Sequence, residues 1–292
     1  MTTFTTTATI NQPSYANDIN FLGIRLTDAP KVATLTDEDF FNQGLDKQKK
    51  GDLQGAIAAY TEAIRLNPNF AKAYSHRGIV HDELGDKKGA IEDFNQALRI
   101  NPNLAEVYYN RGITRADLGD QKGAIEDFNQ TLQINPNDAE AYGSRGIARA
   151  DLGDKKGAIE DYNQALRINP NLAEAYYNRG ITRADLGDKK GAIEDFNQTL
   201  RINPNDAEAY GSRGIARADL GDKKGAIEDF NQTLRINPNE AKAYGNRGIV
   251  RVQLGDNKGA ITDFQQAADI FKQQGKIEDY QKVLEIINRL QK

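Results

Sequence analysis

The chain has 292 residues, of which 38 are Lys or Arg and 42 are Asp or Glu, giving a formal net charge of −4. This balance argues against a nucleic-acid-binding protein or one that binds an anionic membrane surface. The absence of cysteine excludes disulfide frameworks, thiolate catalysis and cysteine-bound zinc. No apolar run approaches the about 20 residues of a membrane span. The N-terminal stretch MTTFTTTATINQPSYANDIN also lacks the basic and apolar regions of a secretory signal. We therefore expect a cytoplasmic protein.

Residues 1–36 differ in composition from the rest of the chain. Six threonines fall within the first nine residues, and Pro13 and Pro30 interrupt any regular element. We expect this segment to be extended or disordered. Its apolar patch, residues 19–26 (INFLGIRL), has two interpretations. It shields the open end of the first repeat, or it docks into a groove of this chain or of a neighbouring one.

The remainder is organised by an Asn-Pro-Asn motif that recurs every 34 residues. The motif begins at Asn67, Asn101, Asn135, Asn169, Asn203 and Asn237. A fixed period of this size is typical of a solenoid, in which each unit buries its apolar face against its neighbours. Seven repeats follow from it: 37–70, 71–104, 105–138, 139–172, 173–206, 207–240 and 241–274.

Each repeat contains two helical patterns. In the fifth repeat, the first pattern places Tyr176, Arg179, Gly180, Arg183 and Leu186 at helical spacing. The second pattern places apolar residues at Ala192, Ile193, Phe196, Leu200 and Ile202. The short connections predict antiparallel helix pairs.

Start and stop signals mark the ends of these helices. Gly187 suits the left-handed end of the first helix, and Asp188 is placed to cap the second. Asn203 precedes a proline, which favours extended backbone and ends the second helix. We expect Asn205 to cap the first helix of the next repeat, with Glu208 completing a capping box.

The last residues, 275–292, form an amphipathic pattern after Gly275. Its apolar positions are Ile277, Tyr280, Leu284, Ile287 and Leu290. A terminal helix with a polar outer face is what a solenoid needs for solubility, so we expect a capping helix. Self-association is the alternative, since Val283 and Ile286 widen the apolar face.

The seven repeats, residues 37–274, resemble the tetratricopeptide repeat family. Repeat five carries the family's residues at Tyr176, Gly180, Ala192, Phe196 and Pro204, and repeat two carries them at Tyr74, Gly78, Ala90, Phe94, Ala97 and Pro102. The resemblance implies an all-α, right-handed superhelical solenoid of seven helix-turn-helix repeats in which the first helices line a concave groove. The chain departs from the family where Arg179 and Arg183 replace apolar residues, and where Lys272 replaces the last proline.

Two consecutive blocks of the chain are nearly identical. Residues 104–171 and 172–239 differ only at the pairs Val107/Ala175, Gln121/Lys189, Gln133/Arg201, Tyr162/Phe230 and Ala165/Thr233. This pattern indicates duplication of a two-repeat unit. Within each block one repeat position alternates between tyrosine and glycine, at Tyr109, Gly143, Tyr177 and Gly211.

A series of arginines is matched by aspartates sixteen residues later. The pairs are Arg77 with Asp93, Arg111 with Asp127, Arg145 with Asp161, Arg179 with Asp195, Arg213 with Asp229 and Arg247 with Asp263. Repeat one has Gln43 and Ala59 instead, so both partners disappear together. We interpret the series as partly buried structural ion pairs; an anion-binding stripe is the alternative.

A second basic series lies one turn further on. Its members are Lys47, His81, Arg115, Arg149, Arg183, Arg217 and Arg251. We expect a solvated face, screened by aspartates two positions later.

The resemblance to the family places a partner-binding groove on the first helices. The corresponding residues are Glu106, Tyr109, Ile113, Asp117, Glu140, Asp151, Glu174, Tyr177, Ile181, Asp185, Glu208 and Asp219. This acidic and apolar set favours a neutral-to-basic peptide with apolar anchors. The alternative is that the glutamates serve only as helix caps and the isoleucines only as packing.

The family's subclass that grips acidic C-termini uses a Lys/Asn clamp. The matching positions hold Phe41, Leu45, His76, Glu106 and Asn110, so the clamp is absent and acidic tails are not the expected ligand.

We therefore expect a non-catalytic protein-interaction scaffold or adaptor with no cofactor. Its only histidines, His76 and His81, are five residues apart, which suits neither a helical metal site nor a catalytic triad. The repeat style is similar to bacterial arrays, some of which help assemble multi-subunit complexes. Two alternatives remain: a regulatory or substrate-presenting subunit of a separate enzyme, and a self-assembling scaffold. We expect a monomer or a weak homo-oligomer.

Overall fold

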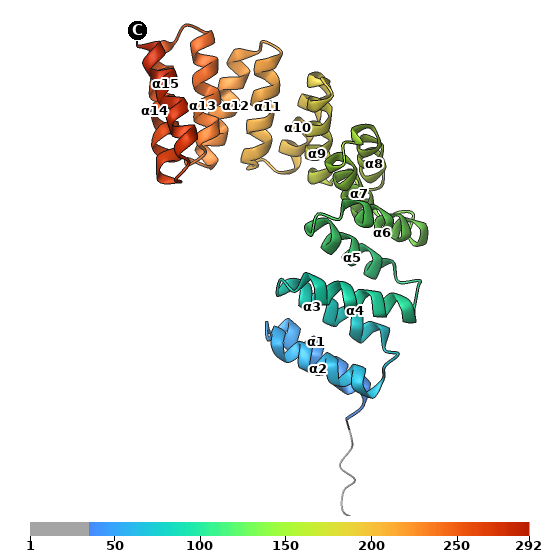
Figure 1. Ribbon diagram of the computed structural model, residues 1–292. Helices are drawn as coiled ribbons and strands as arrows, with labels where there is room; N and C mark the ends of the chain where they lie inside the picture. The colour runs from blue at the N-terminus through green and yellow to red at the C-terminus, as the bar shows by residue number, and fades with distance from the viewer. Residues whose placement is uncertain (1–34, 292) are drawn as a thin grey trace, which may run out of the picture. The chain divides into compact units, whose positions relative to one another are not determined.

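The computed structural model describes residues 35–291, and in this part of the chain every regular element is an α-helix (Figure 1). The apolar patch at residues 19–26 lies outside the described residues. The helices are α1 (Asp37–Lys49), α2 (Leu53–Leu66), α3 (Ala71–Glu83), α4 (Lys87–Ile100), α5 (Ala105–Asp117), α6 (Gln121–Ile134), α7 (Ala139–Asp151), α8 (Lys155–Ile168), α9 (Ala173–Asp185), α10 (Lys189–Ile202), α11 (Ala207–Asp219), α12 (Lys223–Ile236), α13 (Ala241–Gln253), α14 (Asn257–Gln273) and α15 (Ile277–Leu290).

The helices form seven pairs, and each pair packs on the next. Within a repeat the two helices pack along their length, as α9 does with α10, and the second helix then contacts the first helix of the following repeat. First helices also touch one another across successive repeats, as α5 touches α7 and α7 touches α9. The prediction of an all-α solenoid built from seven helix-turn-helix repeats is confirmed.

The turn between the two helices of a repeat is set by glycine and aspartate. Gly187 has a φ of 90°, a left-handed conformation that glycine adopts without steric cost. Asp188 then accepts a hydrogen bond from the Gly191 N–H at 2.9 Å and caps α10. The same cap recurs in all seven repeats, so both predicted signals are confirmed.

The expected cap of the first helix is wrong by one residue. Asp206, and not Asn205, is the N-cap of α11, and it accepts from the Ala209 N–H at 2.9 Å. The Asn-Pro-Asn motif before it forms a tight turn. In the fourth repeat the Asn171 N–H donates to Asn169 Oδ1 at 3.1 Å and closes this turn. The third residue of the motif therefore belongs to the turn.

Close contact between the two helices of a repeat depends on one glycine. The Phe196 ring is buried, and a Cβ atom added at Gly180 would lie only 2.7 Å from its Cε1 atom. The ring therefore packs directly on the backbone of α9. A side chain here would force the helices apart, which explains the Gly180 position and its equivalents in the other repeats.

The C-terminal helix covers the last repeat. Val283 and Ile287 are buried in a cluster with Ala268 and Phe271 of α14, and Ile286 packs against the same cluster. The wide apolar face that made self-association an alternative is therefore used largely within the chain.

Candidate functional site

The alternation of tyrosine and glycine along the first helices decides where the surface is hollowed. The Tyr109 ring lies 5.8 Å from the Phe128 ring of its own repeat, centroid to centroid, and its hydroxyl lies 3.3 Å from Ser144 Oγ in the next repeat. Tyr177 repeats this arrangement with Phe196 at 5.9 Å and Ser212 at 3.4 Å. A tyrosine at this position thus covers the aromatic residue of the second helix.

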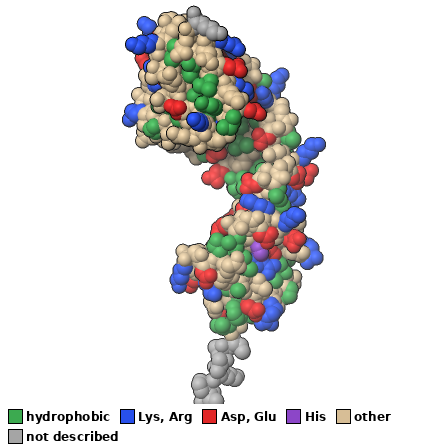
Figure 2. All heavy atoms as spheres, turned by 60° about the vertical axis from the view of Figure 1, so that its left-hand side comes forward, with side chains coloured by type: hydrophobic (Ala, Val, Ile, Leu, Met, Phe, Trp, Pro, Cys, Tyr) green, Lys and Arg blue, Asp and Glu red, His purple; other side chains and the backbone are tan. Residues whose placement is uncertain are grey.

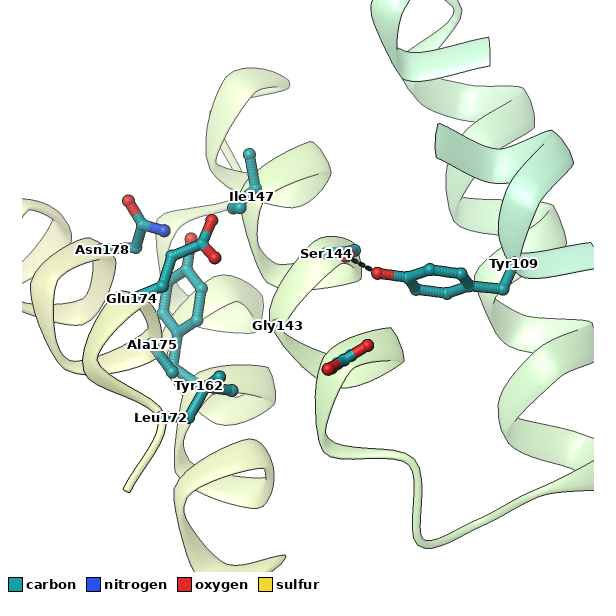
Figure 3. Close-up of a pocket in the computed structure, with 10 residues that line it drawn as sticks. Tyr109, Gly143, Ser144, Ile147, Tyr162, Leu172, Glu174, Ala175 and Asn178 are labelled. Carbon is teal, nitrogen blue, oxygen red and sulfur yellow. Dashed lines mark hydrogen bonds between the residues drawn. The ribbon is translucent and has the colours of Figure 1, made fainter. Parts of the chain in front are cut away.

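Where glycine stands instead, a cavity opens. Gly143 has no side chain to cover Tyr162, and a cavity of about 250 Å³ forms there between α5, α7 and α9. We call it the repeat-four cavity. Figure 3 shows Tyr109 and Ser144 on one side of it and Glu174, Ala175 and Asn178 on the other.

The duplicated block builds a second cavity in the same way. Gly211 leaves Phe230 uncovered, and the resulting repeat-six cavity of about 720 Å³ is also lined by Tyr177, Glu208 and Lys242. A third hollow of about 360 Å³ adjoins Tyr109 and is lined by Asp151; we call it the Asp151 cavity.

Most of the predicted groove residues line these hollows or two further ones. Tyr109, Ile113, Asp117, Glu140, Asp151, Glu174, Tyr177, Ile181, Asp185 and Glu208 each line at least one of five cavities. Glu106 and Asp219 lie outside these five. Ten of the twelve predicted residues therefore line hollows that are formed mainly by the first helices.

Four glutamates on this surface, Glu106, Glu140, Glu174 and Glu208, are called the groove glutamates. All four are exposed, and within residues 35–291 none of them forms a hydrogen bond or an ion pair. They are not side-chain caps: Asp138 and Asp206 cap α7 and α11, and α5 and α9 have no side-chain cap. Their charge is left facing solvent.

The Tyr109 hydroxyl is a neutral hydrogen-bonding group within this acidic surface. Burial raises the pKa of Tyr109 above its ordinary value, and the charges of Glu140, Asp138 and Glu174 raise it further, against the hydrogen bond to Ser144. The phenol therefore stays protonated at neutral pH.

The aspartates at the ends of the first helices bridge successive repeats. Lys87 Nζ lies 2.7 Å from Asp117, Lys155 Nζ 2.9 Å from Asp185, and Lys189 Nζ 2.5 Å from Asp219. Asp151 differs, because it accepts a hydrogen bond from the Gln121 amide at 3.1 Å. The expectation that these aspartates screen the second basic series is wrong, since the cations beside them come from second helices.

The matched arginine and aspartate series forms ion pairs inside each of repeats two to seven. Arg179 Nε and Nη2 lie 3.0 and 2.5 Å from the two oxygens of Asp195, which is 2% exposed, and Arg179 Nη1 donates to Asn163 Oδ1 at 2.7 Å. The guanidinium also lies over the Tyr176 ring, 5.4 Å from its centroid. Equivalent ion pairs join Arg77 to Asp93, Arg111 to Asp127, Arg145 to Asp161, Arg213 to Asp229 and Arg247 to Asp263.

The second basic series contacts the same aspartates and is not a solvated face. Arg183 Nη1 lies 2.9 Å from Asp195 Oδ2, and the side chain is only 24% exposed. Arg115, Arg149, Arg217 and Arg251 make the same contact in their repeats. We call each set of two arginines and one aspartate the bracing network. With every nitrogen of Arg179 engaged, the geometry favours a structural role over an anion site.

The sequence reasoning missed several residues of this surface. Ser144 and Ser212 stand 35 residues after Tyr109 and Tyr177, Tyr162 and Phe230 lie at the cavity floors, and Gln121 contacts Asp151. Gln121 and Tyr162 could have been found from the sequence, because they differ between the two blocks, at 121/189 and 162/230.

Basic and acidic side chains are interspersed over the face shown in Figure 2, with apolar side chains between them. This face has no broad single-sign surface of the kind that binds nucleic acid electrostatically. Within residues 35–291 no helix is both long and apolar enough to span a bilayer.

Family models match most of the repeat array. Two models described as tetratricopeptide repeat match residues 41–105 with 212–275 and residues 105–138 with 173–206, and one described as TPR repeat matches residues 146–187. The chain belongs to the tetratricopeptide repeat family. A comparison of this tetratricopeptide repeat protein with curated protein sequences found no match.

Solved structures support the same assignment. A crystal structure of MamA is 30% identical with a TM-score of 0.54, covering 59% of this chain and 94% of that one. A tetratricopeptide repeat protein from Parabacteroides merdae is 22% identical with a TM-score of 0.65, covering 85% and 98%. YrrB, described as a TPR protein with an unusual peptide-binding site, is 23% identical with a TM-score of 0.55, covering 63% and 95%. At such identities the last two show the fold alone.

Proposed function

We propose that this tetratricopeptide repeat protein is a non-catalytic scaffold that binds an extended segment of a partner protein along the first helices of repeats three to six. The observation that carries the proposal is the repeat-four cavity. Its apolar floor at Tyr162 and its polar wall at Tyr109, Ser144 and Glu174 are held by rigid helices. A pocket of this composition suits a side chain that anchors a peptide.

Preorganisation supports the same conclusion. The cavity walls belong to helices held by glycine contacts and bracing networks, so little ordering cost falls on the protein when a partner docks. The carboxylates favour a partner that is neutral to basic, and the cavity floors favour apolar anchors.

The proposal is tested by filling both cavities. The double variant Gly143→Tyr/Gly211→Tyr places in repeats four and six the residue that Tyr109 and Tyr177 already supply in repeats three and five. A Cβ at Gly143 meets nothing closer than 3.9 Å, and one at Gly211 nothing closer than 3.6 Å, so neither Cβ atom clashes with a neighbour. We expect partners captured by the wild type to be lost, with helicity measured by circular dichroism unchanged.

The matched control is Gln130→Tyr, which adds the same ring to an exposed position of α6. We expect this variant to keep every partner. Retention of all partners by the double variant, with the array folded, contradicts binding along this surface.

A further inference from the structure

The duplication builds the candidate site twice and changes its charge. The first copy joins Tyr109 to Ser144, and the second joins Tyr177 to Ser212. The second copy of the site consists of the residues that stand 68 positions after those of the first. Three positions that line the hollows differ in charge between the copies: Gln121 corresponds to Lys189, Glu174 to Lys242 and Leu172 to Glu240.

Gln121 leaves one carboxylate of the first copy without a cation. Its Nε2 donates to Asp151 at 3.1 Å, but the amide carries no charge. The equivalent aspartate of the second copy, Asp219, has Lys189 Nζ at 2.5 Å. Gln121 Oε1 is also buried and lacks a hydrogen-bond partner among residues 35–291. An unpaired buried acceptor is costly, so Gln121 is not optimised for the fold at this position.

The hollows of the first copy contain carboxylates but no basic side chain. Asp117, Glu140, Asp151 and Glu174 line the repeat-four and Asp151 cavities, whereas neither Lys nor Arg does. Of these four, only Asp117 has an ion-pair partner within residues 35–291, namely Lys87. In the second copy, Lys189 and Lys242 line the corresponding hollows.

The walls of the first copy also suit an alkyl stem. Tyr109 and Ile147 line both of its cavities, and they place apolar surface beside Asp151 and Glu174. A Lys or Arg side chain buries its methylenes along such a surface while its charged end reaches carboxylates. The two features together specify the ligand more narrowly than charge alone.

We propose that the first copy is a specificity site for a Lys or Arg side chain of the bound segment, and that the second copy takes no cation because Lys189 and Lys242 already supply the positive charge. The cationic group lies among Glu140, Asp151 and Glu174. This inference rests on the proposed function, since it specifies which side chain of a bound peptide enters which part of the groove.

The test begins with a random 12-residue peptide library displayed on phage and panned against the wild-type protein. Peptides whose binding is lost in Gly143→Tyr are synthesised, and each Lys is replaced by norleucine and each Arg by citrulline. We expect one basic position at which replacement weakens binding about tenfold, measured by isothermal titration calorimetry. The variant Gln121→Lys, which copies Lys189 of the second block, is expected to weaken the unmodified peptide equally.

The matched control is Gln133→Arg, the other place where the second block carries a cation in place of glutamine. Gln133 is exposed on α6, and the affinity of Gln133→Arg for the peptide is expected to stay within about twofold of that of the wild type. If groove-dependent peptides need no Lys or Arg, or bind Gln121→Lys as tightly as the wild type, the cation site is refuted. The proposed peptide-binding function is then still supported. If no enriched peptide depends on Gly143, both the cation site and the proposed function are refuted.

Discussion

The bracing networks and the groove glutamates differ in burial and in ion pairing, although both place charged side chains in the same repeats. Asp195 is buried and accepts from both Arg179 and Arg183, whereas Glu174 is exposed and has no ionic or hydrogen-bonded partner within residues 35–291. Both are carboxylates on regular helices. The contrast teaches that charges satisfied inside a repeat hold the array together, while unsatisfied charges on the shared surface are available to a partner.

The largest expected effect comes from removing the shared acid of one bracing network. Asp195→Leu strands two guanidinium groups between α9 and α10, and we expect the free energy of unfolding to fall by about 3–5 kcal/mol. Urea denaturation followed by circular dichroism measures this. The neighbouring exposed change Glu194→Leu is the control and should stay within about 0.5 kcal/mol. Equal losses of unfolding free energy in the two variants would show that the bracing network does not stabilise the fold.

Repeat one supplies a way to remove the network without stranding a charge. It holds Gln43, Lys47 and Ala59 where repeat five holds Arg179, Arg183 and Asp195. The triple variant Arg179→Gln/Arg183→Lys/Asp195→Ala therefore copies a set that the fold accepts. We expect its unfolding free energy to lie within about 2 kcal/mol of the wild type in the same denaturation, because no buried charge is left unpaired. A loss as large as that of Asp195→Leu would contradict this account.

Substitution of a groove glutamate should weaken peptide binding and leave the stability of the fold nearly unchanged, in contrast to substitution of Asp195. Glu174→Gln removes an exposed charge without an internal partner, so the unfolding free energy should change by no more than about 0.5 kcal/mol. The affinity for a groove-bound basic peptide should nevertheless fall several-fold at low salt, and the difference should shrink as ionic strength rises. A stability loss above about 1 kcal/mol would place Glu174 among the structural charges instead.

The smallest effect concerns His76, which is partly buried beside aromatic rings. Its ring lies 5.2 Å from that of Phe41 and 5.9 Å from that of Tyr60. Burial lowers the pKa of His76 below its ordinary value of 6.5, with Glu106 opposing the shift. The unfolded chain therefore takes up a proton near pH 6.5 before the folded chain does, so stability present above this pH decreases as the pH falls toward the folded pKa.

This pH dependence is measured as the difference between the wild type and His76→Phe in urea denaturation from pH 8 to pH 5. The wild type should lose more stability than the variant below about pH 6.5. Parallel curves for the two proteins would show that His76 titrates alike in the folded and unfolded chain.

Local signals were sufficient for the architecture. The 34-residue period, Gly187 and Asp188 predicted the helix pairs and their turns, because these signals act on the backbone within a few residues. The Arg179–Asp195 contact was also predictable, since its partners vanish together in repeat one. The cap at Asp206 was missed because Asn205, the last residue of the Asn-Pro-Asn motif, belongs to the turn and not to the helix start.

Contacts between repeats were beyond the sequence. Tyr109 meets Ser144 across 35 residues and Gln121 meets Asp151 across 30, and both depend on how one helix pair is rotated against the next. The sequence by itself determined the repeat, its helices and its internal ion pairs, because each is specified within 34 residues. Only the tertiary structure decided which carboxylates of the first-helix surface are paired and where a cavity opens, because both properties belong to surfaces that two or three repeats form together.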